Sequence, residues 1–476
     1  MFSLKQYING ELVEGKGSPI SVVCPGTGEV IGEVKAVSAE QAQQALEAAR
    51  DAFPAWSALP LEARGAWMLK LAAAVEEEKG KLAEIMAYET GKFYPHSFGE
   101  VSGISRSLQF FLDQAKSNYD ETIRDPMDRN LFLSVREPLG VVVAYIAWNF
   151  PMGNLSMKLG AVMASGCTAV IKPATRTPLS TLYLGEIMQR IGFPAGVINF
   201  VAGSAREVST VLTQSTIPAM LTLIGSSNAG RELVRDSATS IKRFSLELGG
   251  NAPVIVTRNA DVAAAARASM GGKMFNAGQI CVSPQRVFVE RAVHDEFVAA
   301  ARTIAAGAKC GSVYDEGCNT NPLITPDAVA RMEALVADAL EKGATLVAGG
   351  KRPADKAKGN FFLPTVLTDV TTDMRVFREE IFGPILAVMA YDDLDQAIAL
   401  GNDTEYGLYA YGWTRDIVEA NKIARGLRFG SVSLNGGGGG IQVPHGGVKE
   451  SGVGKDGSKY GLDEYYYIKS VRLPVV

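Results

Sequence analysis

A series of short apolar strand signals, alternating with helix-length segments, constrains the fold of this chain most strongly. Between residues 140 and 256 the predicted strands are Val141–Ile146, Thr168–Ile171, Val197–Val201, Met220–Ile224, Arg243–Leu246 and Val254–Val256. Strands that are apolar throughout are typical of parallel sheets covered by helices on both faces. The alternation therefore predicts an α/β fold. Such folds often bind nucleotides, but architecture alone does not establish a function.

The residues before this series form a predicted helical region over 40–117. Its alanine-rich stretches, Ala42–Arg50 and Glu62–Glu78, are expected to be interrupted at Pro54 and Pro60. These prolines should separate successive helices rather than lie within one.

A second strand–helix series follows Asp261. The predicted helices are Ala263–Met274, His294–Ala306 and Asp327–Lys342, and the predicted strands are Arg286–Val289, Thr345–Ala348, Ile385–Ala390 and Ala410–Trp413. Two further strand signals, Asn130–Val135 and Tyr465–Leu473, lie outside both series. An open strand edge must be covered or paired. These two segments therefore predict a small β unit that pairs with a neighbouring subunit.

Length and charge exclude several function classes. The 476 residues suggest two or three domains at about 150 residues each. A net charge of −4, with 21% charged and 47% hydrophobic residues, is that of a globular protein without a basic nucleic-acid footprint. The longest apolar stretch, Val141–Trp148, is far too short to cross a membrane, and the N-terminus lacks a signal-peptide core. We therefore expect a cytoplasmic protein with neither nucleic-acid nor membrane partners.

The rare residues limit the possible chemistry. The five cysteines form no CxxC pair, and an odd number in a reducing compartment indicates free thiols. The three histidines (His96, His294 and His445) are widely separated, so no metal site is expected. Carboxylates, amides, lysines or one thiol should therefore carry any catalysis.

Polar residues at three strand ends are candidate ligand-binding groups. Asn149 and Lys172 each follow a predicted strand, where open α/β sheets bind ligands, and Gly225 and Ser226 open a Gly-rich turn before a helix. Each could instead have a purely structural role: an Asn before proline, a solvated lysine, and an N-capping serine are all common in turns. Taken singly, the signals at Asn149 and Lys172 favour a structural role, and the Gly-rich turn fits both roles equally.

Two further residues are candidates for catalysis. Glu247 lies in an apolar stretch, where an unpaired buried carboxylate is costly, which favours a role as a general base. Cys281 follows a glycine in a loop and could be a reactive thiolate. Most single cysteines are inert core residues, as Cys167 is expected to be.

Seven motifs together resemble those of the aldehyde dehydrogenase superfamily in order and spacing. They are AWNFP (Ala147–Pro151), KPATRTP (Lys172–Pro178), GSSNAG (Gly225–Gly230), LELGG (Leu246–Gly250), GQIC (Gly278–Cys281), EEIFGP (Glu379–Pro384) and PHGGVKESG (Pro444–Gly452). The resemblance covers essentially the whole chain. It implies two Rossmann-like parallel-sheet domains, a cofactor domain over 1–118 and 139–249 and a catalytic domain over 250–449. A β oligomerisation element over 119–138 and 450–476 would form a homodimer or homotetramer.

The resemblance also implies a mechanism. Cys281 would attack the aldehyde carbon, and the Asn149 amide with the Cys281 backbone N–H would hold the oxyanion. After hydride transfer to NAD(P)⁺, Glu247 would activate the water that hydrolyses the thioester. Lys158 would tune Glu247, and Asp456 would lie on a proton path to solvent.

Cofactor residues carry over from the same motifs. Lys172 and Glu380 would bind the two riboses, and Phe382 would pack beside the nicotinamide. The remaining cofactor positions are Ile146, Trp148, Gly225, Ser226 and Leu248. Relatives that prefer NAD often carry a glutamate where this chain has Thr175, which is followed by Arg176. A threonine would offer a hydroxyl donor without repelling a 2′-phosphate, so NADP⁺ is expected to be favoured, with NAD⁺ also used.

The resemblance is less informative about the substrate. The substrate pocket would comprise Phe150, Asn154, Met157, Ile280, Val282, Gly440 of the Gly436–Gly440 run, and His445. Met157 stands where succinate-semialdehyde dehydrogenases commonly carry an arginine. Asn154, His445 and free loop amides favour a short polar aldehyde, hydroxylated or acid-bearing, although the glycine run could equally provide only flexibility.

Three alternatives remain open from the sequence. An aromatic aldehyde could be the substrate. An enzyme that passes the thioester to coenzyme A is a second alternative, although such relatives generally lack the glutamate that corresponds to Glu247. A non-catalytic homologue is the third, and it would have no reason to retain Cys281, Asn149 and Glu247 together.

Overall fold

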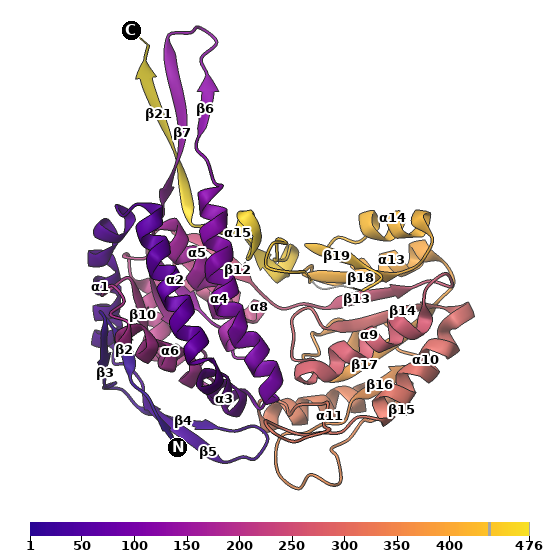
Figure 1. The fold of residues 1–476 in the computed structure, drawn as a ribbon. Helices are drawn as coiled ribbons and strands as arrows, with labels where there is room; N and C mark the ends of the chain where they lie inside the picture. The colour runs from indigo at the N-terminus through magenta and orange to yellow at the C-terminus, as the bar shows by residue number, and fades with distance from the viewer. Residues whose placement is uncertain (437–438, 476) are drawn as a thin grey trace.

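Two large sheets with flanking helices face each other across the molecule, and a narrow three-stranded arm projects from one of them (Figure 1). The structure is a computed structural model and describes residues 1–436 and 439–475. Gly437 and Gly438, within the glycine run singled out above, lie outside the described residues. The expected α/β class with two mainly parallel sheets is confirmed.

The first sheet has eight strands. In spatial order they are β20 (Gly452–Val453), β12 (Arg243–Glu247), β11 (Met220–Ile224), β8 (Val141–Tyr145), β9 (Thr168–Lys172), β10 (Ile198–Phe200), β2 (Gln6–Ile8) and β3 (Glu11–Val13). The five strands from β12 to β10 are parallel, and the edge strands β20, β2 and β3 are antiparallel. The winding direction reverses between β8 and β11. The strand ends at that reversal form the crevice in which such sheets bind ligands.

The central strand β8 shows why these segments are apolar throughout. Val142 and Ala144 belong to the core on one face of the sheet, whereas Val143 and Tyr145 belong to the core on the other face. Successive side chains of a strand point to opposite faces. A strand that is covered on both sides is therefore mostly apolar until its end.

Helices cover both faces of this sheet. They are α1 (Ala39–Ser57), α2 (Leu61–Glu77), α3 (Lys79–Thr90), α4 (Tyr94–Lys116), α5 (Pro151–Ser165), α6 (Leu179–Arg190), α7 (Thr210–Gln214) and α8 (Ser227–Asp236). The expectation that Pro54 interrupts the helical region is wrong, because α1 continues through it to Ser57. A proline near a helix end removes only one intrahelical hydrogen bond, and buried Trp56 anchors the last turn. Pro60 is the residue directly before α2.

The second sheet has seven strands. In spatial order they are β15 (Thr345–Ala348), β16 (Thr365–Thr368), β17 (Ile385–Tyr391), β14 (Pro284–Glu290), β13 (Ala252–Val256), β18 (Tyr409–Trp413) and β19 (Ser431–Leu434). All pairs are parallel except β15 with β16. Val254–Val256, which the sequence joins to the first series, lies in β13 and thus begins the second sheet. The flanking helices are α9 (Val262–Met274), α10 (Arg291–Ala306), α11 (Pro326–Glu341), α12 (Arg375–Arg378), α13 (Leu394–Asn402) and α14 (Ile417–Gly426).

The arm consists of β6 (Glu121–Arg124), β7 (Asn130–Pro138) and β21 (Tyr466–Pro474). The C-terminal strand β21 pairs with β7 along the whole length of both, and the pair extends away from the rest of the molecule (Figure 1). The segment between β20 and the arm contains α15 (Ser458–Asp463), which packs against α4 and α5. The C-terminal strand of the arm therefore begins only after α15, whereas the C-terminal part of the predicted oligomerisation element starts at residue 450.

A smaller sheet of β1 (Phe2–Ser3), β5 (Val30–Lys35) and β4 (Pro19–Val23) completes the described elements near the N-terminus. Among the helices that the structure describes, none combines the length and the apolar character needed to cross a lipid bilayer.

Candidate active site

A cavity of about 640 Å³ opens where the ends of the first sheet's parallel strands face residues from the second sheet and the C-terminal segment. Most residues singled out from the sequence line this cavity. They are Ile146, Trp148, Asn149, Phe150, Asn154, Met157, Lys172, Thr175, Gly225, Ser226, Glu247, Cys281, Glu380, Phe382, His445 and Asp456. Residues that are far apart in the chain thus converge on one space.

A tight turn presents Cys281 to the cavity. The preceding residues Asn276, Ala277 and Gly278 all have left-handed backbone angles, with φ of 49°, 52° and 70°. At Gly278 an added Cβ would lie 2.4 Å from the carbonyl oxygen of Gly383, and at Gly250 it would lie 2.1 Å from that of Cys281. Side chains at these two glycines would therefore displace the Cys281 loop. Backbone strain of this kind often marks functional loops.

Asn149 connects the first sheet to this loop. It lies between β8 and α5, and its Nδ2 donates to the backbone carbonyl of Gln279 at 3.0 Å. In return, Nδ2 of Asn276 donates to the Asn149 carbonyl at 3.1 Å. A side-chain amide carries two hydrogens. One hydrogen of the Asn149 amide therefore orients the group, and the second is available to an oxygen in the cavity.

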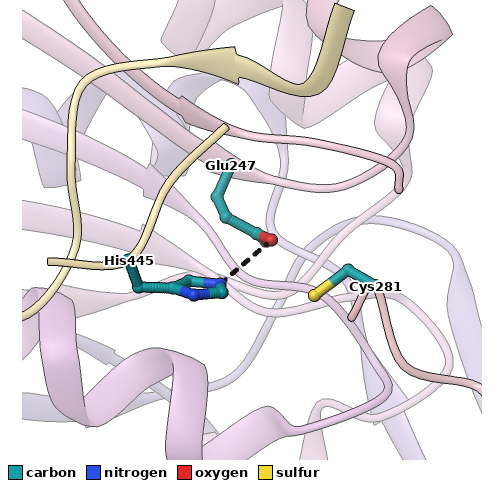
Figure 2. A group of neighbouring side chains, drawn as sticks. All are labelled: Glu247, Cys281 and His445. Carbon is teal, nitrogen blue, oxygen red and sulfur yellow. Dashed lines mark ion pairs between the residues drawn. The ribbon is translucent and has the colours of Figure 1, made fainter. Parts of the chain in front are cut away.

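Glu247, Cys281 and His445 form a compact cluster (Figure 2). Glu247 ends β12 and is 5% exposed. Its Oε1 lies 3.4 Å from Nε2 of His445. One ligand-type atom from each of the three side chains lies within 4.8 Å of the other two. His445, expected only as a pocket residue, is thus a direct neighbour of the carboxylate.

The surroundings of this cluster favour a protonated thiol in the free protein. Burial raises the pKa of the Cys281 thiol well above its usual range, and the nearby charge of Glu247 raises it further. Burial opposes protonation of His445, but hydrogen bonding to Glu247 and the charges of Glu247 and Asp456 outweigh it and raise the pKa of the imidazole. Cys281 therefore needs a proton acceptor before it can attack, and both Glu247 and His445 are within reach.

The direct partner of Lys158 is Asp456. The sequence suggests that it tunes Glu247, but its Nζ forms an ion pair with Oδ1 of Asp456, and both side chains are almost completely buried. A buried ammonium requires a charged partner, and the carboxylate that provides it is Asp456. Asp456 is also joined to His445 by backbone hydrogen bonds in both directions, at 2.8 and 2.6 Å.

The other half of the cavity has the groups that a dinucleotide requires. Ser226 caps α8, its Oγ accepting from the Ala229 N–H at 3.2 Å, at a helix N-terminus suited to a pyrophosphate. Lys172 is buried, with only a long contact of 3.4 Å to the Pro173 carbonyl, and burial lowers its pKa to about 8. A buried ammonium without a carboxylate partner among the described residues is suited to an anionic or hydroxyl-bearing ligand.

Glu380 and Phe382 approach this crevice from the second sheet. Glu380 accepts a hydrogen bond from the Gly250 N–H at 2.8 Å, and burial raises its pKa to about 7. The ring of Phe382 lies 5.5 Å from that of Trp148, almost perpendicular to it. Both aromatic residues line the same cavity as Cys281.

Thr175 lines the cavity, but its hydroxyl hydrogen is already used. Oγ1 of Thr175 donates to the Gly203 carbonyl at 3.0 Å, whereas the sequence predicts it as a donor to a 2′-phosphate. In the folded chain the Gly203 carbonyl lies within hydrogen-bonding distance of the Thr175 hydroxyl and accepts its hydrogen. The oxygen of the Thr175 hydroxyl can still accept a hydrogen bond. Position 175 carries no carboxylate. The neighbouring Arg176 is exposed and outside the lining.

Several other expected residues are outside the lining of the cavity. They are Lys158, Leu248, Ile280, Val282 and Gly440. Leu248 is buried against Gly230, where an added Cβ would lie 2.6 Å from its side chain. Ile280 and Val282 flank Cys281 and are half-buried, and Gly440 is exposed.

Sequence reasoning misses three residues around the nucleophile. Gln279 and Asn276 bind Asn149, as described above. The ring of Phe275 lies 6.1 Å from that of Phe150, and Phe275 lines a second cavity of about 620 Å³. The unusual Asn-Ala-Gly run before Gln279 is the one available sequence signal, because Asn and Gly tolerate left-handed backbone angles.

Comparisons with known proteins agree with this geometry. The sequence model of the aldehyde dehydrogenase family matches residues 12–471. The glutarate-semialdehyde dehydrogenase of Pseudomonas putida KT2440 is 39% identical over 100% of this chain and 98% of that protein. The NADP(+) succinate-semialdehyde dehydrogenase GabD of Escherichia coli K12 is 39% identical over 98% and 97%. The crystal structure of an E. coli NADP-dependent enzyme superposes with a TM-score of 0.97 at 38% identity, covering 100% of this chain and 98% of that one.

Proposed function

The chain belongs to the aldehyde dehydrogenase family, and we propose that it oxidises a short polar aldehyde to the carboxylate with NADP⁺ or NAD⁺. The observation that carries the proposal is the convergence of the Cys281 thiol, the Asn149 amide and the Glu247 carboxylate on one cavity. A nucleophile, an oxyanion donor and a general base are the three groups that acyl chemistry through a thioester requires.

The first half of the reaction forms a covalent intermediate. Glu247 or His445 takes the proton from Sγ of Cys281, and the sulfur attacks the aldehyde carbon. As the C–S bond forms, the carbonyl π electrons move to the oxygen, which receives hydrogen bonds from the Asn149 amide and the Cys281 backbone N–H. When bound, the oxidised nicotinamide supplies the hydride acceptor that converts this thiohemiacetal into a thioester.

The second half releases the acid. Once any proton that Glu247 took from Cys281 has passed to solvent, Glu247 takes a proton from a water molecule, whose oxygen attacks the thioester carbon, and the C–S bond breaks. The product leaves as a carboxylate, and the thiolate of Cys281 is restored. Since the buried Glu247 side chain reaches the cluster from β12, hydrolysis is favoured over transfer of the acyl group to coenzyme A.

Cofactor preference follows from the crevice. Lys172 and Glu380 would bind ribose hydroxyls, Ser226 with the start of α8 would face the pyrophosphate, and Phe382 would pack beside the nicotinamide. No carboxylate at position 175 repels a 2′-phosphate, and Lys172 is a nearby cation. NADP⁺ is therefore favoured, with NAD⁺ as an alternative, in keeping with the NADP(+) named for the GabD relative.

The substrate end of the cavity supports a polar tail. Asn154 and His445 line it beside Met157 and Phe150, so hydrogen-bonding groups face a substrate held at Cys281. The two semialdehyde dehydrogenases reported above act on aldehydes that carry an acid group. Met157 supplies no charge, so recognition of the tail would rely on Asn154, His445 and backbone groups.

Two further expectations belong to this proposal. The projecting arm would pair with a neighbouring subunit in a homodimer or homotetramer, because its strands leave apolar side chains exposed. The mechanism also needs a free thiol at Cys281, which favours a reducing compartment such as the cytoplasm.

A kinetic screen tests the proposal. Purified enzyme is assayed with acid-bearing, hydroxylated, alkyl and aromatic aldehydes of matched size, each with NADP⁺ and with NAD⁺. The expected result is the highest kcat/KM for an acid-bearing or hydroxylated aldehyde with NADP⁺, and a free acid as product without coenzyme A. A preference for alkyl or aromatic aldehydes, or a product that forms only with coenzyme A, would contradict it.

A further inference from the structure

Three metal-ligand side chains come together at the nucleophile. Sγ of Cys281, Nε2 of His445 and a carboxylate oxygen of Glu247 all lie within 4.8 Å of one another, and Figure 2 shows the three side chains pointing toward a common point. The scattered histidines give no reason to expect this from the sequence. We propose that Glu247, Cys281 and His445 bind a single Zn²⁺ ion, and that Zn²⁺ held there inhibits the enzyme.

The spacing of these atoms suits a tetrahedral ion. Zn–N and Zn–O bonds of about 2.0–2.2 Å at tetrahedral angles separate the two ligand atoms by about 3.3–3.6 Å. Nε2 of His445 and Oε1 of Glu247 are 3.4 Å apart. A Zn–S bond of about 2.3 Å requires the sulfur to lie about 3.6 Å from the other ligand atoms. The sulfur lies within 4.8 Å of the other two ligand atoms, so a shift of at most about 1.2 Å is needed to reach that distance.

The burial of Glu247 also suits a cation. Its side chain is more than nine-tenths buried, and Oε1 meets no well-directed hydrogen-bond donor among the described residues. Its contact with Nε2 of His445, at 3.4 Å, is an ion pair only when the imidazole is protonated. A buried carboxylate oxygen without a donor is costly. A metal ion at the point that Glu247 faces would satisfy it.

The surroundings of His445 also suit a ligand. Histidines that bind metals usually have a second group that fixes the ring. Asp456 is bonded to the His445 backbone in both directions, and its Oδ2 is buried without a partner in the part of the chain that the structure describes. The Asp456 carboxylate is also close enough for its charge to act on the imidazole.

The ligand set selects zinc over the common hard cations. Mg²⁺ and Ca²⁺ prefer oxygen ligands, whereas thiolate with imidazole suits Zn²⁺. On binding, the S–H bond of Cys281 breaks, its proton passes to solvent and an S–Zn bond forms, with no change of oxidation state. The two negative charges of the thiolate and Glu247 then balance the ion. Three protein ligands leave a fourth position open to water in the cavity.

Occupation of this site would stop the reaction. The sulfur lone pair would be engaged by the metal, and Glu247 could no longer accept a proton. Zinc binding itself does not depend on the proposed function, whereas the inhibition rests on it.

Cobalt spectroscopy tests the binding. Metal-free full-length protein is titrated with Co²⁺, which replaces Zn²⁺ and absorbs through thiolate-to-metal charge transfer when a cysteine binds it. We expect one Co²⁺ per chain, displaced by one equivalent of Zn²⁺, and no such absorption in Cys281→Ser. His445→Gln should weaken Co²⁺ binding at least about tenfold. Removal of a residue that only orients a metal ligand already has an effect of that size, and His445 would be a ligand itself.

Matched controls separate this site from other residues. His294→Gln removes a histidine outside the cluster, and Cys318→Ser removes another partly exposed thiol, so both should bind Co²⁺ as the unaltered protein does. Absorption that persists in Cys281→Ser, or binding that His445→Gln leaves unchanged, would overturn the site.

Inhibition is measured as the ratio of each protein's NAD(P)H production with and without Zn²⁺. We expect this ratio to fall close to zero for the unaltered enzyme, to recover with a chelator, and to stay near one for His445→Gln at the same Zn²⁺ concentration. Bound Co²⁺ together with undiminished activity in Zn²⁺ would overturn the inhibition. If no aldehyde were oxidised at all, the proposed function would fail, and the cobalt spectrum would still decide the metal site.

Discussion

The side-chain amide of Asn149 donates a hydrogen bond to the backbone carbonyl of Gln279 at 3.0 Å, two residues before Cys281. This contact joins the end of a strand in the first sheet to the loop that carries the nucleophile. It fixes the amide plane so that the second hydrogen can point into the cavity. Orientation before the reaction is what makes an oxyanion donor effective.

Asn149→Ala should therefore lower kcat by about 10²–10³, the usual effect of losing one oxyanion donor. Steady-state kinetics with the best aldehyde from the screen measures it, and cofactor binding by fluorescence checks that the fold is retained. Asn421→Ala on α14 is the matched control, since Nδ2 of this exposed residue outside the cavity lining binds only the backbone carbonyl of Ile417, at 2.9 Å. A loss in kcat below tenfold for Asn149→Ala would exclude the amide as an oxyanion donor.

The buried ion pair of Lys158 with Asp456 leads to a prediction about stability. Asp456→Ala leaves the Lys158 ammonium buried without its partner, so the free energy of unfolding should fall by about 3–5 kcal/mol. The double substitution Lys158→Met with Asp456→Ala removes both charges and should recover most of that loss, and Lys158→Met alone completes the cycle. Urea denaturation of the four proteins in this cycle measures the coupling.

The half-exposed pair of Arg352 with Glu333 is the control for that cycle. Removing Arg352 should change the free energy of unfolding by less than about 1 kcal/mol, because solvent screens such pairs. Equal losses from Arg352→Ala and Asp456→Ala would show that burial does not determine the effect.

The apolar strands were the most predictable part of the fold. The predicted Met220–Ile224 and Thr345–Ala348 match β11 and β15 to the residue. For β11 the signal is local, since a short apolar run between polar turns is typical of a buried strand. The very short strands β1, β2 and β20 were not predicted, because two or three residues carry no periodicity.

The chemistry of the site was less predictable than its location. The motifs bring Asn149, Glu247 and Cys281 to one cavity, as expected from the resemblance. The partners of individual side chains are set by packing between distant segments. Lys158 binds a residue 298 positions away, and the Thr175 hydroxyl binds the backbone of a loop. Periodicity and propensity contain no information about such contacts.

Thr175→Glu should reverse the cofactor preference. A carboxylate at this position would repel a 2′-phosphate, and a repulsion of about 1.4 kcal/mol already lowers affinity tenfold. We expect kcat/KM for NADP⁺ to fall at least about tenfold while that for NAD⁺ changes little. Thr175→Gln introduces an uncharged side chain of the same size as glutamate. It should leave the ratio of kcat/KM for NADP⁺ to kcat/KM for NAD⁺ nearly unchanged. Equal losses of kcat/KM for NADP⁺ and NAD⁺ in Thr175→Glu would show that the adenosine ribose does not bind beside position 175.

The lowered pKa of Lys172 predicts a pH dependence of cofactor binding. Burial lowers this pKa to about 8, so the side chain is charged below that pH and becomes neutral above it. Loss of the charge removes an attraction for the 2′-phosphate. The Kd for NADP⁺, measured by fluorescence titration, should therefore rise above pH 8, and more steeply than the Kd for NAD⁺.

Lys172→Met is the control for this titration. It should bind NADP⁺ more weakly at pH 7, and the difference in pH dependence between the two cofactors should disappear. A Kd for NADP⁺ that rises equally steeply in Lys172→Met would assign the titration to another group.

The exposed apolar residues of the arm lead to a prediction about assembly. Ile468 in β21 is 59% exposed and Ile123 in β6 is 53% exposed, on a sheet that projects into solvent (Figure 1). A narrow three-stranded sheet buries little surface within one chain, so a second copy is the natural partner for these side chains. Ile468→Lys would place a charge in that contact. Light scattering after gel filtration should show a smaller assembly than for the unaltered protein.

The control for this experiment is Ile417→Lys on α14, a residue that is 74% exposed and lies far from the arm (Figure 1). It adds the same charge and removes a comparable exposed side chain, so the mass should not change. Since Ile468 makes no contribution to the cavity, any loss of activity in Ile468→Lys should follow the loss of assembly as the protein is diluted. An unchanged mass for Ile468→Lys, down to concentrations at which the unaltered enzyme dissociates, would show that the subunits meet through another surface.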